Sequence, residues 1–435
     1  MITARAFAGK HYAVLGLARS GLATVEALVA SGAIVTAWDQ DPEARERTAD
    51  AVGDLLPQLD NAYLYFADLD TADLSQFDSL VVSPGVPLNR LPLAQRAREA
   101  GLEIIGDVEL FARARPELPP HKVVGITGTN GKSTTTALVH HILQTAGVPS
   151  AMGGNIGLPI LAQDPLPEGG IYVLELSSYQ IDLTQSLDCD VAVLLNITPD
   201  HLDRYECFEA YAASKARLFE MQSMGWAVIA TDDSETRKIA EQRSQLTRVS
   251  ADDYAKWQRH WPALQGPHNR QNAAAAIAVS KELGVGWPTI EVALKFYPGL
   301  PYRMERVRKK DGVFFVNDSK ATNATATAPA LAAFDAVRWI LGGQAKSDTL
   351  DECAPHFGHV RKAYTIGEAG EMFARLLRPH MAVAECKTLD AAVKSAAAEA
   401  EAGDTVLLSP ACASFDQFKN FEERGDKFRQ LVGAL

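Results

Sequence analysis

A glycine-rich loop between an expected strand and an expected helix constrains the fold of this chain most. The sequence around it is KVVGITGTNGKSTTTALVHHILQTAG, an apolar run followed by a loop that ends in Gly131-Lys132 and by a helical pattern. Glycines let successive backbone N–H groups point at a phosphate, and the helix presents its positive end to the same anion. We expect Lys132 to reach the β- and γ-phosphates of a nucleotide and the hydroxyl of Ser133 or Thr134 to ligate Mg²⁺. The strict GxxxxGK[ST] spacing is not met, because Ile126 replaces its first glycine.

Short apolar runs alternate with helical patterns along the chain, which predicts strands joined by crossover helices and therefore parallel sheets. Proline-containing stretches at 115–120 and 298–301 interrupt this alternation. We therefore predict three consecutive α/β domains: a Rossmann-like domain at 1–113, a central P-loop ATPase-like domain at 114–299 and a Rossmann-like C-terminal domain at 300–435. The expected strands lie at 11–17, 33–39, 79–85, 122–127, 171–178, 191–198, 225–231, 313–320, 337–343, 363–367 and 405–411.

The composition of the 435-residue chain narrows the class of protein. Hydrophobic residues make up 47% and charged residues 22%, as in ordinary globular proteins that dissolve in water. The net charge of −12 argues against binding to nucleic acid or to an anionic membrane. Five scattered cysteines without a CxxC pair fit reduced thiols. No signal peptide or membrane-spanning run is recognisable, so we expect a cytoplasmic protein without membrane insertion, and a monomer.

A second glycine loop, Gly16-Leu-Ala-Arg-Ser-Gly21, follows the first expected strand and opens a helix. It is similar to a dinucleotide-binding fingerprint, with Ala18 in place of the middle glycine. Asp39 ends the next strand, where an acidic residue accepts hydrogen bonds from a ribose or a base. From this segment alone, a nicotinamide-dependent dehydrogenase is a fair rival interpretation.

Two groups that suit magnesium follow the phosphate loop along the chain. Glu175 ends a buried strand in LELSSYQ, and His201 lies in NITPDHLDRY. A carboxylate and an imidazole at strand ends beside a phosphate loop can hold Mg²⁺, directly or through water. Taken singly, Glu175 fits a capping residue and His201 a turn histidine, but their joint occurrence after the loop favours a metal site.

The segment TGTNGKSTT closely resembles the ATP loop of the Mur ligase and folylpolyglutamate synthetase superfamily. These enzymes activate a carboxylate as an acyl phosphate, and an amine then displaces the phosphate. The resemblance covers about residues 10–430 and implies an ATP-dependent ligase that uses two Mg²⁺ ions. It also implies that Lys215, in YAASKARLFE, is carbamylated by CO₂ and supports the second ion.

The resemblance implies roles for residues in all three domains, although Tyr302 replaces the histidine more often found beside Arg303. The expected catalytic residues are Lys132, Glu175, His201 and Lys215. The expected metal site comprises Ser133, Thr134, Glu175, His201 and Lys215. The expected ATP contacts are Gly128, Thr129, Asn130, Gly131, Lys132, Ser133, Thr134, Asn269, Asn272, Arg303, Asp318 and Lys320.

The first domain is assigned by the same resemblance to the UDP part of UDP-N-acetylmuramoyl-L-alanine rather than to a nicotinamide. Ser83-Pro84-Gly85 is expected near the pyrophosphate. The full set of expected contacts with the sugar nucleotide is Leu17, Ala18, Asp39, Gln40, Ser83, Pro84, Gly85 and Asn155.

The C-terminal segment SPACASFDQFKNFEERG, at 409–425, looks very like that of the superfamily members that add D-glutamate in peptidoglycan synthesis, a pathway on which cell shape and division depend. The implied contacts of the glutamate are Thr322, Lys346, Ser414 and the backbone of Phe421. A substrate with two carboxylates needs cationic and N–H donors at both ends, which one lysine with hydroxyl and backbone donors supplies.

Three alternatives stay open. Another ligase of the superfamily would add a different amino acid, or L-glutamate. A P-loop binding or switch module without ligase chemistry would have no need of Glu175 and His201. A nicotinamide dehydrogenase is suggested by the first domain alone.

Overall fold

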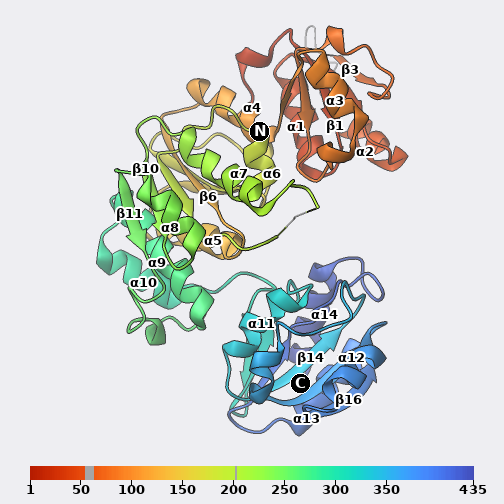
Figure 1. Cartoon of the computed structure of the whole chain (residues 1–435), viewed down its shortest axis with the longest axis vertical. Coiled ribbons are helices and arrows are strands. Elements are labelled where there is room, and N and C mark those ends of the chain that lie inside the picture. The colour runs from red at the N-terminus through yellow and green to blue at the C-terminus, as the bar shows by residue number, and fades with distance from the viewer. Residues whose placement is uncertain (54–62, 201–202) are drawn as a thin grey trace. The chain divides into compact units, whose positions relative to one another are not determined.

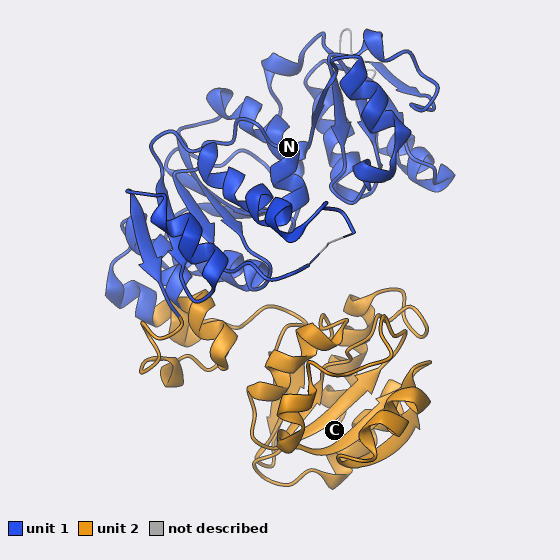
Figure 2. Ribbon diagram, viewed as in Figure 1, with its two compact units in different colours: residues 1–250, 274–291 blue, residues 251–273, 292–435 orange. Residues whose placement is uncertain are grey.

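The computed structural model in Figure 1 describes residues 1–53, 63–200 and 203–435. Within these ranges the strands form three sheets of five, six and six strands. The chain divides into two compact units (Figure 2), unit 1 with residues 1–250 and 274–291 and unit 2 with residues 251–273 and 292–435. Unit 1 contains the first two sheets and unit 2 the third. The predicted class of consecutive α/β domains is confirmed, whereas the bounds 1–113, 114–299 and 300–435 stay a prediction.

The first sheet is parallel throughout and has the strand order β3-β2-β1-β4-β5. Its strands are β1 (His11–Leu15), β2 (Ile34–Trp38), β3 (Tyr63–Phe66), β4 (Ser79–Val82) and β5 (Glu103–Ile105). Its helices are η1 (Arg5–Phe7), α1 (Arg19–Ala30), α2 (Pro42–Gly53), η3 (Leu74–Gln76), η4 (Leu88–Arg90), α3 (Pro92–Glu99), α4 (Asp107–Ala114) and η5 (Arg115–Glu117).

The second sheet is also parallel, with the order β11-β10-β9-β6-β8-β7. Its strands are β6 (His121–Thr127), β7 (Ser150–Gly154), β8 (Gly170–Glu175), β9 (Val191–Leu194), β10 (Trp226–Ala230) and β11 (Leu246–Val249). The helices of this region are α5 (Lys132–Thr145), η6 (Ile160–Ala162), α6 (Ser178–Asp182), α7 (Phe208–Glu220), α8 (Ser234–Glu241), η7 (Gln258–His260), α9 (Pro267–Glu282) and α10 (Trp287–Phe296).

The third sheet has the order β12-β13-β17-β14-β15-β16, and its edge strand β12 is antiparallel to β13. The strands are β12 (Glu305–Lys310), β13 (Val313–Asn317), β14 (Val337–Gly342), β15 (Val360–Ile366), β16 (Ala382–Lys387) and β17 (Thr405–Leu408). The helices are α11 (Ala324–Ala332), η8 (Ala354–His359), α12 (Gly370–Leu377), α13 (Leu389–Glu399) and α14 (Phe421–Gly433).

The central strands lie where the apolar runs predicted strands. The edge strands were not predicted. Strands β4, β8, β9 and β17 are buried along their whole length, as strands covered on both faces should be. In contrast, β3 (YLYF) is largely exposed and β12 (ERVRKK) is mostly polar, so neither presents a run of buried residues. None of the described helices is both long and apolar enough to span a membrane.

Candidate functional site

The phosphate loop joins β6 to α5 at the carboxyl ends of the strands in the second sheet. Gly131 caps α5 with a φ of 85°, and Gly128 has a φ of 152°, so both adopt backbone conformations that favour glycine. The backbone N–H groups of Thr129 and Asn130 donate to the main-chain and side-chain oxygens of Asn196, each at 2.8 Å. The loop is therefore held against the end of β9.

Two lysines converge on one carbonyl of this loop. Lys132 Nζ donates to the carbonyls of Gly128 and Thr129 at 2.9 and 2.8 Å. Lys215 of α7 is buried, and its Nζ donates to the same Gly128 carbonyl at 3.0 Å while lying 4.6 Å from the ring centroid of Tyr211. Burial, and next the charge of Lys132, lowers the pKa of Lys215 to about 7. A large neutral fraction near pH 7 follows, and the neutral amine is the form that reacts with CO₂.

Glu175 ends β8 beside the phosphate loop, and its Cα is paired in register with Ile126 of β6. The side chain is only 2% exposed. Its Oε1 accepts a hydrogen bond from Asn155 Nδ2 at 2.9 Å. Its Oε2 is buried and has no hydrogen-bond partner among the residues that the structure describes. Such an orphaned carboxylate oxygen next to a phosphate loop suits a bound cation.

Of the other expected metal ligands, two adjoin the phosphate loop and one lies outside the described residues. Ser133 and Thr134 begin α5, directly after the loop. His201 lies outside the described residues, so its place in the site stays a prediction. Across 1–53, 63–200 and 203–435, no three His, Cys, Asp or Glu side chains are grouped as a metal site. Mg²⁺ commonly binds one or two carboxylates together with phosphate oxygens and water, and Glu175 beside a phosphate loop fits that mode.

A cavity of about 390 Å³ opens between the glycine loop that begins at Gly16, the segment after β4 and the loop after β7, all in unit 1. Six of the eight expected sugar-nucleotide contacts line it: Ala18, Asp39, Ser83, Pro84, Gly85 and Asn155. Leu17 is buried, whereas Gln40 is exposed and lies apart from this lining. The cavity thus gathers residues from both sheets of unit 1 around one volume.

Asp39 connects two loops of this cavity. Its Oδ2 accepts from the N–H of Leu17 at 2.7 Å, and its Oδ1 accepts from the N–H of Asp41 at 3.0 Å. Each carboxylate oxygen keeps a further lone pair, so it can still accept a hydrogen bond from a ribose hydroxyl or a base N–H. Arg19, which is absent from the expected contacts, also lines the cavity, and its Nη2 donates to the carbonyl of Gly157 at 2.5 Å.

Two of the expected ATP contacts, Asn269 and Asn272, lie on the first turns of α9. Asn269 and Asn272 are 4% and 2% exposed. Asn269 Nδ2 donates to the carbonyl of Gln265 at 3.0 Å, and Asn272 Nδ2 donates to Asn269 Oδ1 at 3.1 Å. The two amides therefore orient each other. Burial lowers the pKa of the adjoining His268 to about 4, so this imidazole is neutral.

Asp318 directly follows β13 in unit 2 and holds the segment that enters the third sheet. Its Oδ1 accepts from the N–H of Met304 at 3.1 Å, and its Oδ2 accepts from Ser409 Oγ at 2.7 Å. Burial raises the pKa of Asp318 to about 7. Arg303 precedes Met304, whose φ is 49°. Asp318 therefore helps to fix the backbone next to the arginine expected at the ATP phosphates.

Arg424 of α14 joins the two functional turns of unit 2 and was absent from the expected site. The side chain is 1% exposed, and its guanidinium donates to Ser319 Oγ and to the carbonyls of Ser319, Cys412 and Ala413 at 2.9–3.2 Å. Ser319 lies between the expected ATP contacts Asp318 and Lys320. Cys412 and Ala413 precede Ser414. No local sequence signal marks this role, since the partners lie 11 to 105 residues away.

Two of the expected glutamate contacts adjoin partners of this arginine: Ser414 follows Ala413, and the carbonyl of Phe421 accepts from Ser319 Oγ at 2.9 Å. Ser414 is buried, and the backbones of Ala413 and Gln344 exchange two hydrogen bonds of 2.9 Å, which places the loop of Lys346 alongside it. Lys346 is exposed and Thr322 is partly exposed. The Nζ of Lys320 lies 3.7 Å from the ring centroid of Phe421, the first residue of α14. An expected ATP contact thus touches an expected glutamate contact.

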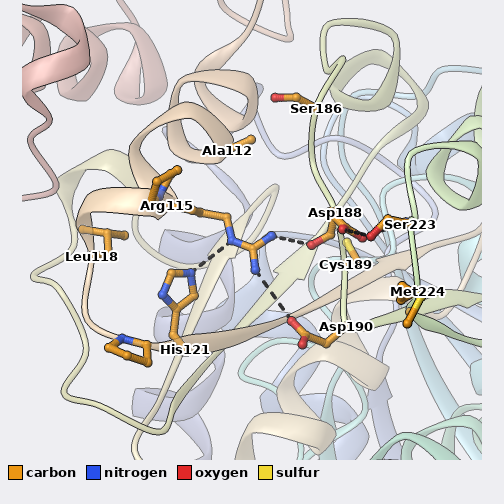
Figure 3. Close-up of a pocket in the computed structure, with 13 residues that line it drawn as sticks. Ala112, Arg115, Leu118, His121, Ser186, Asp188, Cys189, Asp190, Ser223 and Met224 are labelled. Atoms are coloured by element: carbon orange, nitrogen blue, oxygen red, sulfur yellow. Dashed lines mark hydrogen bonds and ion pairs between the residues drawn. The ribbon is translucent and has the colours of Figure 1, made fainter.

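Figure 3 shows a different cavity, of about 680 Å³, at the amino ends of the strands in the second sheet. Arg115 reaches across it to the carbonyl of Asp188, to His121 Nε2 at 3.1 Å and to the carboxylate of Asp190 at 3.6 Å. His121 begins β6, whereas the phosphate loop follows the other end of that strand. This cavity and the phosphate loop therefore lie at opposite ends of β6, and the cavity is separate from the candidate site.

The fold and the loop define the class: a three-sheet α/β protein with a phosphate loop on its central sheet. Family models match all three regions: the Mur ligase MurD-like N-terminal domain at 10–106, the Mur ligase middle domain at 126–261 and the Mur ligase glutamate ligase domain at 302–412. The chain belongs to the Mur ligase family, which confirms the resemblance found in the sequence.

Relatives named UDP-N-acetylmuramoylalanine–D-glutamate ligase match along the whole chain. The protein of Novosphingobium aromaticivorans is 58% identical over 100% of this chain and 97% of its own length. That of Sphingopyxis alaskensis is 59% identical over 100% of both chains. A solved UDP-N-acetylmuramate-alanine ligase of Thermotoga maritima shares the fold, with a TM-score of 0.57 at 16% identity over 98% of this chain and 99% of that one.

Proposed function

We propose that this chain is an ATP-dependent amide ligase that joins D-glutamate to the alanine carboxylate of UDP-N-acetylmuramoyl-L-alanine in the cytoplasmic stage of peptidoglycan synthesis. One observation carries the proposal: Lys132, Lys215 and the orphaned oxygen of Glu175 lie around the phosphate loop. Relatives of 58% and 59% identity that bear this ligase's name support the identity of the substrates.

ATP binds with its phosphates against the N–H groups of the loop and the N-terminus of α5, where Lys132 stabilises the β- and γ-phosphates. Magnesium, when bound, neutralises the charge that develops on the transferred phosphoryl group. Glu175, Ser133 and Thr134 would hold the first ion, and a second ion is proposed at Lys215. His201 is proposed to position a metal-bound water or the substrate.

Lys215 is proposed to carry a carbamate. Its neutral amine attacks the carbon of CO₂, a nitrogen–carbon bond forms while one carbon–oxygen π bond opens, and one amine proton leaves to solvent, which converts a neutral amine into an anion. The reaction requires a desolvated, unprotonated amine, and the buried Nζ with a pKa of about 7 meets that requirement.

The sugar nucleotide occupies the cavity lined by Asp39, Ser83 and Asn155, with Arg19 as an added partner for its pyrophosphate. The alanine carboxylate attacks the γ-phosphorus, ADP leaves, and an acyl phosphate forms. The D-glutamate amine then attacks the acyl carbon, loses a proton, and phosphate leaves. Lys346, Thr322, Ser414 and the N–H of Phe421 hold the second substrate. Positioning and charge neutralisation supply most of the rate.

A phosphate-release assay tests the proposal. Purified protein is given ATP, Mg²⁺ and UDP-N-acetylmuramoyl-L-alanine, with D-glutamate, L-glutamate, L-alanine, lysine or diaminopimelate as the amine. We expect release to require the sugar nucleotide and D-glutamate together. Phosphate release at the same rate with and without an amino acid would instead identify a P-loop module. Faster release with another amine would identify a different ligase.

A further inference from the structure

Arg204 connects the two sheets of unit 1. Its guanidinium donates to the carbonyls of Gly85 and Val86, each at 3.0 Å, and lies over the ring of Tyr179, 4.6 Å from the centroid. Gly85 and Val86 follow β4 of the first sheet and line the proposed sugar-nucleotide cavity. Tyr179 belongs to α6, the helix that follows Glu175. Arg204 therefore ties a wall of that cavity to an element beside the metal site.

A neighbouring contact strengthens the same connection. Asn89 Nδ2 donates to the carbonyl of Asp203 at 3.1 Å, and Arg90 pairs with the Asp203 carboxylate at 3.0 Å. Both partners of this ion pair are about 60% exposed, so it adds little free energy. Arg204 carries the connection better, because a planar guanidinium can donate to two carbonyls while its face covers a ring.

Three tyrosine rings continue from Arg204 to the phosphate loop. Tyr179 stacks on Tyr205 with centroids 6.1 Å apart, and Tyr205 packs edge-on against Tyr211 at 5.4 Å. The hydroxyl of Tyr211 lies 3.1 Å from Thr129 Oγ1, and its ring lies under the Nζ of Lys215. Tyr205 is fixed by its hydroxyl, which donates to a carboxylate oxygen of α6 at 2.8 Å. The packed path therefore runs from the cavity wall to the loop.

We infer that Arg204 is a positioning residue that couples occupancy of the sugar-nucleotide cavity to nucleotide binding at the phosphate loop. A ligand that fixes the Gly85–Val86 carbonyls holds Arg204, and Arg204 holds the tyrosine path against Thr129 and Lys215. Coupling of this kind is reciprocal, so each ligand raises the affinity of the protein for the other by the same factor. The inference rests on the proposed function, which supplies the two ligands.

The test compares Arg204→Met with Arg98→Met in the full-length protein. Both arginines line one cavity of about 460 Å³, but within the described residues the Arg98 side chain makes no hydrogen bond or ion pair. The dissociation constant of a non-hydrolysable ATP analogue with Mg²⁺ is measured with and without saturating UDP-N-acetylmuramoyl-L-alanine, in the absence of D-glutamate. Arg204→Lys is a milder second variant, since it keeps a cation over the ring but loses the paired donation.

For wild type and Arg98→Met, we expect the sugar nucleotide to lower the dissociation constant of the analogue about fivefold or more, within the range of allosteric coupling. The coupling ratio is the dissociation constant of the analogue alone divided by that with the sugar nucleotide. In Arg204→Met this coupling ratio should fall to about 1, and in Arg204→Lys it should take an intermediate value. Without the sugar nucleotide, both variants should bind the analogue within about twofold of wild type. A wild-type ratio in Arg204→Met, or in Arg204→Lys if the first variant does not fold, overturns the inference. So does a ratio of one in a wild-type enzyme that is active with both substrates. Inactive wild type refutes the proposed function instead.

Discussion

At the scale of single residues, the side-chain nitrogens of Lys132 and Lys215 both donate to the carbonyl of Gly128. Placing Lys132 and Lys215 so close is unfavourable while both are charged, and this repulsion adds to burial in lowering the pKa of Lys215. In the proposed function, a bound triphosphate stabilises Lys132 and a carbamate reverses the sign of the charge at Lys215.

Carbamate formation at Lys215 should rise as the pH rises through about 7, because the neutral amine is depleted below its pKa. With ¹³C-enriched bicarbonate, we expect a carbamate carbon signal in NMR spectra at pH 8 that is weak at pH 6 and lost in Lys215→Arg. Lys122→Arg, a change at an exposed lysine of β6, should leave the signal intact. A signal that persists in Lys215→Arg would assign the carbamate elsewhere.

Glu175 and Glu109 are both buried glutamates of unit 1. Replacement by glutamine should lower activity at Glu175 and stability at Glu109. Glu175 leaves Oε2 without a partner, so Glu175→Gln should lower kcat by about 100-fold or more, as loss of a group that stabilises transition-state charge does, without lowering Tm. Glu109 accepts four hydrogen bonds, one from Arg113. Glu109→Gln should therefore cost about 3 kcal/mol of stability.

Phosphate release and thermal melting of the two variants decide this comparison. A fall in the Tm of Glu175→Gln as large as that of Glu109→Gln would show that Glu175 has a structural role. Retention of activity in Glu175→Gln would remove it from the metal site.

At the scale of elements, helix α14 is seated by its first turns on the segment that enters the third sheet. Tyr302, with a φ of 61°, donates from its hydroxyl to Asp426 at 3.0 Å, and Arg429 lies over its ring at 4.5 Å. Gly425 leaves room for this ring. The tyrosine that replaces the more usual histidine is thus accommodated by the helix that also carries Arg424.

Gly425→Ala tests this packing. An added Cβ would lie 2.3 Å from Tyr302 Cδ1, so the ring must move, and overpacking of this kind costs about 1–3 kcal/mol. Gly433→Ala, at the end of the same helix, meets nothing within 4 Å and should be neutral or slightly stabilising. Thermal melts of both variants measure the difference. Equal melting temperatures would contradict the close approach of Tyr302 to α14.

At the scale of the whole molecule, the proposed substrates use residues of both compact units. The phosphate loop and Glu175 belong to unit 1, whereas Arg303, Asp318 and Lys346 belong to unit 2. Each unit therefore carries expected contacts of its own, and a substitution in one unit can be tested through the substrate whose binding it affects.

Lys346→Ala should raise the KM for D-glutamate, because it removes the cation expected to pair with the glutamate carboxylate. The KM for the sugar nucleotide should stay as in wild type, since its cavity lies within unit 1. The phosphate-release assay measures both values. An unchanged KM for D-glutamate would remove Lys346 from the glutamate site.

Local patterns in the sequence identified the fold class, the central strands and the phosphate loop. Those features depend on neighbouring residues: apolar runs for buried strands, and the spacing of glycines, lysine and hydroxyls for the loop. Edge strands such as β3 and β12 were missed because solvent on one side removes the apolar run that marks a strand.

Only the tertiary structure decided which side chains meet. Lys215 reaches Gly128 across 87 residues, Arg204 reaches Gly85 across 119, and Arg424 reaches Ser319 across 105. Sequence alone showed that the chain has lysines and arginines near its motifs, but not their acceptors. The choice of acceptor depends on how buried segments pack, because a desolvated cation must take the oxygen atoms that the fold places within its reach.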